Sequence, residues 1–279
     1  MTELDFPKAV LLGIIQGLTE FLPISSSAHL AFAQRWMALR PDSPSMFMFD
    51  GLLHVGTLIS VAVVFWSSIG RFTAQFIRQC ATGWTGRRNA WRIAILGVVA
   101  SVPTAVIGLG FKEQLEADFG RPRWIGAELI ATGLLLAVMA FLPRGRRGLR
   151  EFTWWQAALV GTAQGVAIIP GISRSGATIC TASFFGLRRR WAAEFSFFIA
   201  FPAILGATAI QFKDMLESGV EAAGQLPWAP ILAGSAVSLF VGIVALKLLV
   251  RAVMRAKLHY FALYCWALGA MILLGACSG

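Results

Sequence analysis

The chain has 279 residues, of which 57% are hydrophobic and only 14% are charged. A soluble domain carries roughly a quarter charged residues, so this composition excludes an ordinary soluble protein and predicts one embedded in a lipid bilayer. The net charge of +10 does not indicate nucleic acid binding, because most of the arginines fall in loops between apolar segments. There they orient a membrane protein and contact anionic lipid headgroups, so membrane lipids are the expected partner and nucleic acid is not.

The first apolar stretch, residues 10–32, is interrupted at residues 23–27 by Pro-Ile-Ser-Ser-Ser. The acidic N-terminus before this stretch and Asp50 after it are both expected on the outer side of the membrane. The stretch must then enter the bilayer and return to the same face. It is predicted to form a re-entrant helical hairpin.

Four polar residues mark the two arms of this first hairpin. Gln16 and Glu20 are four residues apart and share one face of the entering helix, while Ser26 and His29 can share a face of the returning one. An ionisable group inside an apolar run is costly, so Glu20 is a candidate functional residue, with a structural ion pair as the alternative. For His29 the alternative is a neutral hydrogen bond between helices.

Six further stretches are apolar over a length that suits a membrane span, which takes about 20 residues. They are residues 49–69, 93–111, 124–142, 195–212, 228–250 and 260–275. Asp50 and His54 open the first of them and could support a site from this neighbouring helix. The expected fold is an all-α polytopic membrane protein with six transmembrane helices plus two re-entrant helical hairpins.

Four loops are rich in basic residues: 71–92, 144–150, 188–190 and 251–257. By the positive-inside rule all four lie on the cytoplasmic side. Loops 144–150 and 188–190 then share one side, although an apolar stretch of roughly forty residues joins them. That stretch must also enter and return, and its break at Pro-Gly-Ile-Ser, residues 170–173, marks the turn of the second hairpin.

The two breaks have similar sequences around them. Gly-Ile-Ile-Gln-Gly at residues 13–17 precedes the first, and Gly-Thr-Ala-Gln-Gly at residues 161–165 precedes the second. Two copies inserted from opposite faces form an inverted-topology repeat, here with halves 1–142 and 143–279 in a single membrane domain, and such folds place their site where the broken helices meet. Chance similarity between short segments rich in glycine and serine is the alternative.

The second break carries an arginine with apolar flanks. Arg174 cannot face lipid cheaply, and its planar fork donates to carboxylate or phosphate. Ser173, Ser175 and the backbone at Gly171 stand at the start of a half-helix, where free N–H groups and the helix dipole attract anions. The serines of the first break offer the same, so the two breaks predict a site for a phosphorylated group. A sodium site would use serine and glycine without an arginine.

These residues resemble the signatures of a known family. Gln16 and Glu20, followed by Pro-Ile-Ser-Ser-Ser-Ala-His-Leu at residues 23–30, resemble the first signature of the undecaprenyl-pyrophosphate phosphatases, also called bacitracin-resistance proteins. Pro-Gly-Ile-Ser-Arg-Ser-Gly-Ala-Thr at residues 170–178 resembles the second, and length and hydropathy match over essentially the whole chain. Ala28 stands where many members have glycine. Gln16 stands where some have glutamate, so it is given no essential acid role.

The resemblance implies an enzyme that hydrolyses undecaprenyl pyrophosphate to undecaprenyl phosphate and inorganic phosphate. This reaction recycles the lipid carrier for cell-wall synthesis and confers bacitracin resistance. The partner is then a polyprenyl pyrophosphate lipid, and a homodimer is left open. The resemblance also implies a multi-pass protein of the bacterial cytoplasmic membrane whose site opens to the outer, periplasmic face.

On this reading Arg174 clamps the diphosphate and stabilises developing charge. Ser26 is the candidate nucleophile and His29 its proton acceptor or the acid for the leaving group, with a water activated by His29 as the competing version. Glu20 either binds a divalent cation, Mg²⁺ or Ca²⁺, that bridges the phosphates, or orients His29. The residues expected to bind the pyrophosphate through hydroxyl, amide or backbone groups are Gln16, Ser25, Ser27, Gly171, Ser173, Ser175 and Thr178.

Two other classes of protein fit part of this pattern. A secondary transporter or flippase for the lipid carrier would use the same inverted repeat, but it would perform no chemistry and would tolerate loss of Arg174. An intramembrane serine protease would also need a buried serine and histidine. It would normally take them from different helices and has no need of Arg174.

Overall fold

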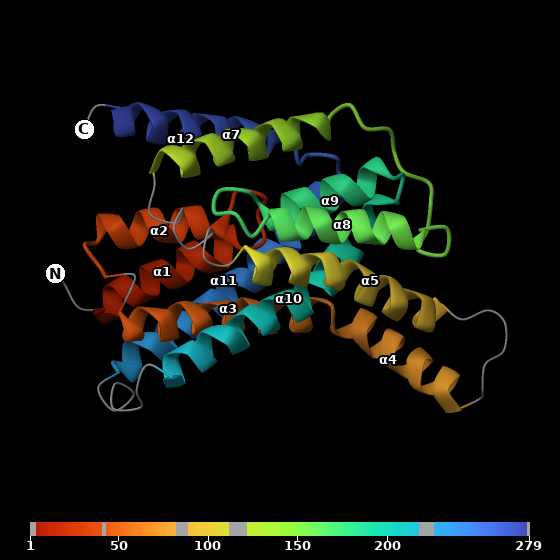
Figure 1. Ribbon diagram of the computed structural model, residues 1–279, viewed down its shortest axis with the longest axis horizontal. Helices are drawn as coiled ribbons and strands as arrows, with labels where there is room; N and C mark the ends of the chain where they lie inside the picture. Colours follow the sequence, from red (N-terminus) through yellow and green to blue (C-terminus); the bar gives the residue numbers. More distant parts are fainter. Residues whose placement is uncertain (1–3, 41–42, 82–88, 112–121, 218–225, 278–279) are drawn as a thin grey trace.

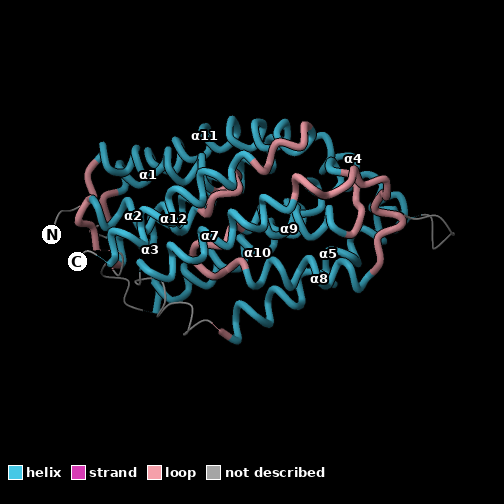
Figure 2. The backbone as a smooth tube through the Cα atoms, turned by 90° about the horizontal axis from the view of Figure 1, so that it is seen from above, coloured by secondary structure: helices cyan, strands magenta, loops and turns pink. Residues whose placement is uncertain are grey.

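The computed structural model describes residues 4–40, 43–81, 89–111, 122–217 and 226–277 (Figure 1). Within these ranges the chain forms eleven α-helices and no β-strand, as expected for an all-α protein. The helices are α1 Phe6–Thr19, α2 Ser26–Trp36, α3 Pro44–Val64, α4 Trp66–Ala81, α5 Asn89–Gly110, α7 Pro122–Val138, α8 Trp154–Val166, α9 Arg174–Phe184, α10 Arg189–Glu217, α11 Trp228–Met254 and α12 Tyr260–Cys277. Most run broadly along the long axis of the molecule (Figures 1 and 2).

Among the described residues, four helices are long and apolar enough to cross a membrane: Ser45–Val64 in α3, Ala90–Gly110 in α5, Arg189–Ile210 in α10, and α11. The predicted span at residues 49–69 is wrong at its C-terminal end. Helix α3 stops at Val64, and Trp66 begins the separate helix α4, which has no buried residue. The physical reason is the sequence after Phe65, where Ser67, Ser68 and Arg71 make the first turns of α4 too polar to continue the apolar span.

Two pairs of short helices reach the centre of the molecule from opposite ends. Helices α1 and α2 come from one end, and α8 and α9 come from the other (Figure 1). Each pair is broken where the sequence predicts a turn. Pro23 and Pro170 lack the N–H group that would continue the helical hydrogen bonds. Gly171 has φ +104°, a conformation that glycine adopts without the cost of a Cβ.

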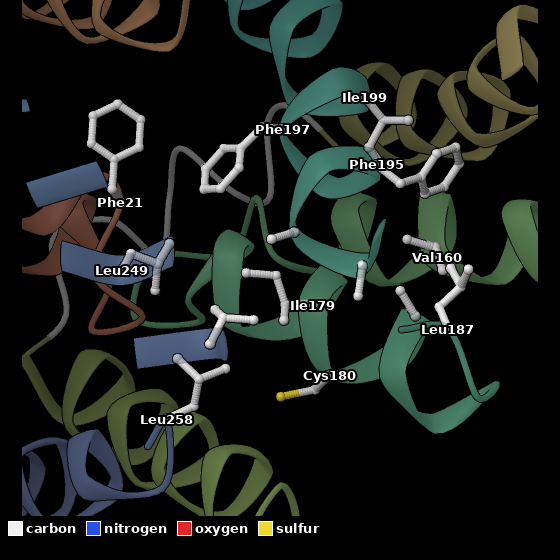
Figure 3. Packing of buried hydrophobic residues seen from close by; sticks show 14 of the residues in the cluster. Phe21, Val160, Ile179, Cys180, Leu187, Phe195, Phe197, Ile199, Leu249 and Leu258 are labelled. Carbon is white, nitrogen blue, oxygen red and sulfur yellow. The ribbon is translucent and has the colours of Figure 1, made fainter. Parts of the chain in front are cut away.

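The outer arms of the two pairs pack on long helices in matching ways. Helix α1 lies along α11, and α8 lies along α5. A Cβ added to Gly13 would lie 2.3 Å from the carbonyl oxygen of Gly234, and one added to Gly161 would lie 1.9 Å from that of Ala100. Glycine lets the paired backbones approach closely, a common device in membrane helix packing. The inner helices surround an apolar core that includes Phe21, Ile179 and Phe197 (Figure 3).

The basic loops at residues 144–150 and 188–190 meet at one end of the molecule. The backbone N–H of Arg147 donates to the carbonyl of Gly186 at 3.0 Å, and that of Arg188 donates to the carbonyl of Arg147 at 2.9 Å. The apolar stretch between the loops, which contains α8 and α9, therefore leaves this end and returns to it. That is the path the basic loops predict for the second hairpin.

Candidate active site

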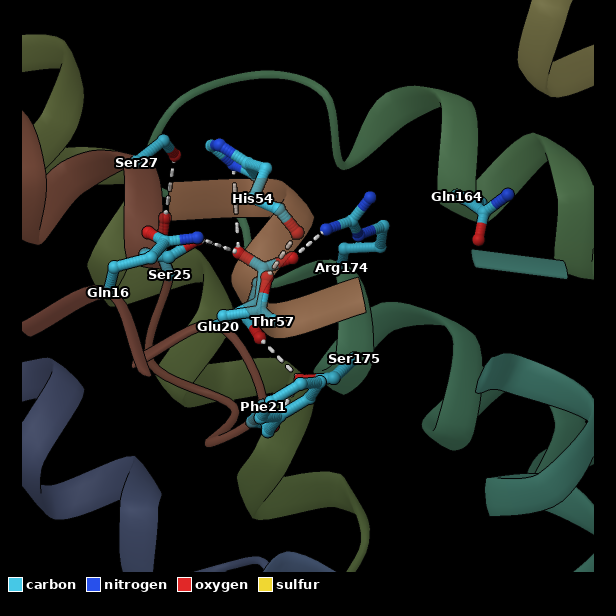
Figure 4. Close-up of polar contacts among 12 residues, drawn as sticks. Gln16, Glu20, Phe21, Ser25, Ser27, His54, Thr57, Gln164, Arg174 and Ser175 are labelled. Carbon is cyan, nitrogen blue, oxygen red and sulfur yellow. Dashed lines mark hydrogen bonds and ion pairs between the residues drawn. The ribbon is translucent and has the colours of Figure 1, made fainter. Parts of the chain in front are cut away.

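The turns at residues 20–25 and 167–173 are joined by direct hydrogen bonds. The backbone N–H of Gly171 donates to the Ser25 hydroxyl at 3.0 Å, and the Ser175 hydroxyl donates to the carbonyl of Phe21 at 2.9 Å (Figure 4). Helices α2 and α9 both begin at this junction. The two breaks that the sequence singles out therefore form one centre in the structure.

The carboxylate of Glu20 links several residues of this centre. Its buried carboxylate forms an ion pair with Arg174 through Oε1, and its Oε2 accepts a hydrogen bond from the Ser26 hydroxyl at 2.7 Å (Figure 4). Gln16 Nε2 donates to the same Oε2 at 3.0 Å, and His54 Nε2 lies 3.9 Å from it. These donors and the guanidinium stabilise an ionised carboxylate in an apolar surrounding. The ion pair that the sequence left as an alternative for Glu20 is present, and it joins the two turns.

The helix N-termini give this centre a second set of positive partners. Ser26 is the first residue of α2 and Arg174 the first of α9, and both contact Glu20. Unpaired N–H groups and the dipole at a helix start attract anions. The Arg174 side chain is 25% exposed, so its guanidinium can be reached from outside. The arrangement suits an anion larger than one carboxylate.

His29 is held by partners other than Ser26. Its Nδ1 lies 2.7 Å from the carbonyl oxygen of Ser25, which can only accept, so Nδ1 carries the proton. Its Nε2 lies 2.7 Å from the hydroxyl of Tyr264 on α12, and the two rings stack. In the described part of the chain, His29 forms no hydrogen bond with Ser26 or Glu20. Ser26 instead has Glu20 as its proton acceptor.

Ser25 adopts an uncommon backbone conformation between these contacts. Its φ of 69° is costly for a residue with a Cβ, and such strain persists only where the surroundings hold it. The carbonyl of Ser25 is fixed by His29, and its hydroxyl accepts from Gly171. The same hydroxyl lies 3.2 Å from that of Ser27. His29 thus helps to shape the turn that presents Ser26.

The other predicted binding residues lie at the start of α9 and are partly engaged there. The Ser173 hydroxyl accepts from the N–H of Gly176 at 3.2 Å and caps the helix. It also lies 3.3 Å from the Ser175 hydroxyl, while Thr178 donates to the carbonyl of Arg174 at 2.9 Å. A pocket opens beside the Glu20–Arg174 pair, and Ser175 and Thr178 line it too.

Sequence reasoning missed two residues that support the centre. Thr132 on α7 accepts from the N–H of Ser173 at 3.1 Å and donates to the carbonyl of Gly171 at 2.9 Å. Tyr264 binds His29. The sequence could have indicated Tyr264 as a candidate site residue, since it is one of only two tyrosines and lies in an otherwise apolar stretch. Thr132 gave no such signal, because threonine is common in apolar helices.

His54 and Asp50 lie on α3, beside the centre. His54 Nδ1 is 2.8 Å from the carbonyl of Asp50, so its Nε2 faces Glu20 without a proton when the ring is neutral. Gln34 Nε2 donates to both oxygens of the Asp50 carboxylate, at 2.9 and 3.1 Å. Among the residues that the structure describes, no three His, Cys, Asp or Glu side chains gather as a metal site.

The chain is similar to known proteins over nearly its whole length. The family model for bacitracin resistance protein BacA matches residues 9–271. A curated undecaprenyl-diphosphatase of Halorhodospira halophila is 43% identical over 280 residues, covering 96% of each chain. Proteins of the same name from Alkaliphilus metalliredigens and Carboxydothermus hydrogenoformans are 40% and 38% identical. Those alignments cover 96% and 98% of this chain, and 97% and 98% of the relatives.

Proposed function

This chain belongs to the family of bacitracin resistance protein BacA, and we propose that the centre around Glu20, Ser26 and Arg174 is its active site. The enzyme is an undecaprenyl-diphosphatase, a membrane hydrolase that converts undecaprenyl diphosphate to undecaprenyl phosphate and inorganic phosphate. This reaction recycles the lipid carrier for cell-wall synthesis and confers bacitracin resistance. The observation that carries the site assignment is the ion pair of Glu20 with Arg174, which joins the two turns at the starts of α2 and α9.

Arg174 first binds the diphosphate. A guanidinium forms paired hydrogen bonds with phosphate as well as with carboxylate, so the incoming diphosphate competes with Glu20 for it. The N–H groups at the starts of α2 and α9 and the hydroxyls of Ser173, Ser175 and Thr178 bind the remaining phosphate oxygens. Gly171, Ser25 and Ser27 keep the two turns together, and Gln16 keeps the Glu20 carboxylate in place.

The move of Arg174 to the phosphate prepares Glu20 to act as a base. While the guanidinium is paired with it, the carboxylate is a weak proton acceptor. When the guanidinium leaves, the carboxylate gains basicity at the moment the substrate is in place. Its Oε2 already accepts from Ser26 at 2.7 Å, within reach for proton transfer.

Ser26 then attacks the terminal phosphorus. A bond forms between Ser26 Oγ and phosphorus, the bond from phosphorus to the bridging oxygen breaks, and undecaprenyl phosphate leaves with that oxygen. The proton of Ser26 passes to Glu20, which then gives it to the bridging oxygen of the leaving undecaprenyl phosphate. Water next attacks the phosphorus of the phosphoserine and gives a proton to Glu20. The bond from phosphorus to Ser26 Oγ breaks, inorganic phosphate leaves, and Glu20 returns the proton to Ser26 Oγ. The competing version places a water in the role of Ser26, with the same base. His29 acts through the turn at Ser25 as a positioning residue.

We propose that a divalent cation, Mg²⁺ or Ca²⁺, enters with the diphosphate. Mg²⁺ typically uses one or two carboxylates plus substrate phosphates and keeps several waters. Glu20 fits this small requirement, since its Oε1 accepts a cationic group, Arg174, in the structure. A bound cation would neutralise phosphate charge. Glu20 would hold it through Oε1, the oxygen that Arg174 vacates, and Oε2 would stay with Ser26, so in this version the carboxylate mainly orients Ser26 and is a weaker base than without the cation.

We further propose that residues 1–142 and 143–279 form an inverted-topology repeat in one membrane domain. Six helices, α3, α5, α7, α10, α11 and α12, then cross the bilayer, and the pairs α1–α2 and α8–α9 are re-entrant hairpins. The matching contacts of α1 with α11 and of α8 with α5 support this. The basic loops support an orientation with their end in the bacterial cytoplasm, and we propose that the site opens toward the outer face of the cytoplasmic membrane.

The activity is tested by phosphate release from undecaprenyl diphosphate by detergent-purified protein, with Mg²⁺ or with EDTA. We expect release by the wild type, loss of release with EDTA, and a fall of about a thousandfold in kcat for Ser26→Ala. An unchanged rate with EDTA would remove the cation from the mechanism. Full activity of Ser26→Ala would assign the nucleophile to water. No release from folded protein under any metal condition would contradict the active-site assignment.

A further inference from the structure

The end of the molecule where α8 begins and α9 finishes carries a concentrated positive charge (Figure 1). Residues 144–151 and 186–194 meet there and contain seven arginines but only two glutamates. We call these two segments the arginine platform. Its arginines are Arg144, Arg146, Arg147, Arg150, Arg188, Arg189 and Arg190.

The two segments of the platform are fixed to each other through backbone groups. Besides the two backbone hydrogen bonds described above, the Nε of Arg188 donates to the carbonyl of Arg146 at 2.9 Å. A Cβ added to Gly145 would lie 2.1 Å from the carbonyl oxygen of Leu187, so the two chains run in close contact. The fold therefore holds arginines from distant parts of the sequence together, although their like charges repel.

The two glutamates do not neutralise this charge. Glu194 pairs with Arg190 at 2.9 Å, and Glu151 accepts a hydrogen bond from a backbone N–H at 2.9 Å. Within the described ranges no carboxylate forms an ion pair with Arg144 or Arg189, and these two guanidinium groups lie close enough to repel each other. Such a pair favours an anion that both can bind, and guanidinium groups bind phosphate through paired hydrogen bonds.

Exposed aromatic rings border the platform. Phe141 and Trp154 flank its first segment, Phe184 precedes the second, and all three are more than half exposed. Aromatic side chains next to basic residues are typical of the level of the lipid headgroups in a membrane protein. A phosphate that arrives there on a lipid can bind the arginines while its acyl chains contact the rings, which a free phosphate cannot do.

We propose that the arginine platform binds the headgroup of an anionic phospholipid, with Arg144 and Arg189 sharing its phosphate. The bound phosphate offsets the repulsion between the two guanidinium groups and so stabilises the junction of residues 144–151 with residues 186–194. This junction joins the two ends of the second hairpin. The lipid acts there as a structural ligand, and its site is separate from the centre around Glu20, so the proposal stands without the reaction assigned to that centre.

The proposal is tested by lipid binding to the full-length protein. Detergent-purified protein would be titrated with dioleoyl phosphatidylglycerol or with dioleoyl phosphatidylcholine, and bound lipid would be measured by native mass spectrometry. Arg144→Gln/Arg189→Gln removes the proposed phosphate ligands. The matched control is Arg251→Gln/Arg255→Gln, which removes the same two charges from exposed positions at the end of α11.

We expect the wild type to bind phosphatidylglycerol at least about tenfold more tightly than phosphatidylcholine, and less tightly as salt is raised. Arg144→Gln/Arg189→Gln should weaken binding of phosphatidylglycerol about 30-fold, and the control variant should stay within about threefold of the wild type. Equal affinity for the two lipids, or an equal loss in both variants, would overturn the proposal. Displacement of the lipid by an equal concentration of inorganic phosphate would also overturn it, because the ligand would then be a free anion.

A second measurement does not depend on the folding of a variant. Hydrogen exchange of the wild-type backbone would be followed with each lipid present. The N–H groups of Arg147 and Arg188 join the two segments, so they should exchange about tenfold more slowly with phosphatidylglycerol than with phosphatidylcholine. Unchanged exchange at these two groups, or slowing confined to residues 251–257, would overturn the proposal.

Discussion

The turns at residues 20–25 and 167–173 share a framework and differ in chemistry. Each follows a helix with a buried glutamine, contains a proline, and ends at a serine that precedes the next helix. The first carries Glu20 and is followed by Ser26, whereas the second carries Ile168 and is followed by Arg174. One turn therefore supplies the acceptor and the hydroxyl, and the other supplies the cation. A site for a diphosphate is completed only where both meet.

The two buried glutamines show the same division. Gln16 donates to the Glu20 carboxylate at 3.0 Å. Gln164 lies away from the centre and donates to Thr104 and to the carbonyl of Ile199, both at 3.3 Å (Figure 4). The same residue type at similar places serves the site in one half and the helix packing in the other. The role of each glutamine is therefore set by the groups that the fold places beside it.

Loss of the cation should have the largest effect. Arg174→Ala removes the group that binds the diphosphate and leaves the Glu20 carboxylate buried without its counter-ion. We expect kcat/KM for phosphate release to fall by about a thousandfold or more. Arg174→Lys keeps the charge without the planar fork, so it should retain more activity, with a fall of roughly 10- to 100-fold. Equal activity of Arg174→Ala and the wild type would contradict a catalytic role for the second turn.

Because the two halves pack in matching ways, equivalent glycine substitutions should cause similar losses of stability in both. Gly13→Val and Gly161→Val each place a side chain against a carbonyl of the facing helix. Each should lower stability in detergent by about 1–3 kcal/mol or more, measured as the loss of folded protein on heating. Gly70→Val is the control, because nothing lies within 4 Å of a Cβ at that exposed position. A large loss of stability in only one of the two variants would contradict the equivalence of the two halves.

Substitution of the two buried glutamines should have different effects: loss of the Gln16 side chain should lower activity, and loss of the Gln164 side chain should lower stability. Gln16→Ala removes a hydrogen bond to the carboxylate and should lower kcat/KM about tenfold. Gln164→Ala removes bonds that hold α8 to α5 and α10, so it should lower the melting temperature and leave kcat near the wild-type value. If Gln164→Ala lowered kcat as much as Gln16→Ala does, the second half would have a share in catalysis that its contacts do not explain.

The smallest effect is expected at Tyr264. Tyr264→Phe keeps the ring that stacks on His29 and removes the hydroxyl that binds its Nε2. Since His29 acts through the turn at Ser25, we expect a fall of only two- to tenfold in kcat, with KM for the lipid little changed. His29→Ala should fall further, because the carbonyl of Ser25 then loses its donor. A larger effect for Tyr264→Phe than for His29→Ala would give the tyrosine a role of its own.

The positions of the two helix breaks and the path of the second hairpin could be predicted, because they depend on short stretches of sequence. The prolines and serines mark the breaks, and the basic loops predict that α8 and α9 leave one end and return to it. An ion pair was one of two alternatives for Glu20, since an ionisable group in an apolar run needs a partner, but the sequence did not name Arg174 as that partner. The end of α3 at Val64 was misplaced, because apolar residues continue past it into the exposed helix α4.

The detailed roles could not be predicted, because they depend on contacts between distant parts of the chain. Spacing put Ser26 and His29 on one helix face, and no local pattern indicated another partner for either. In the structure Ser26 turns to Glu20, and His29 turns to the Ser25 carbonyl and to Tyr264. The hydroxyl of Tyr264 reaches the site from the last helix, and no local pattern could show that contact.

The two turns act as one site through Glu20 and Arg174. A double-mutant cycle tests it most directly, with kcat/KM measured for the wild type, Glu20→Gln, Arg174→Lys and the double variant. We expect the double variant to be about as active as the weaker single variant. The coupling then equals the loss caused by Arg174→Lys alone, about 1.4–2.7 kcal/mol for a fall of 10- to 100-fold. Losses that simply multiply would show that the two residues act independently and would contradict the account.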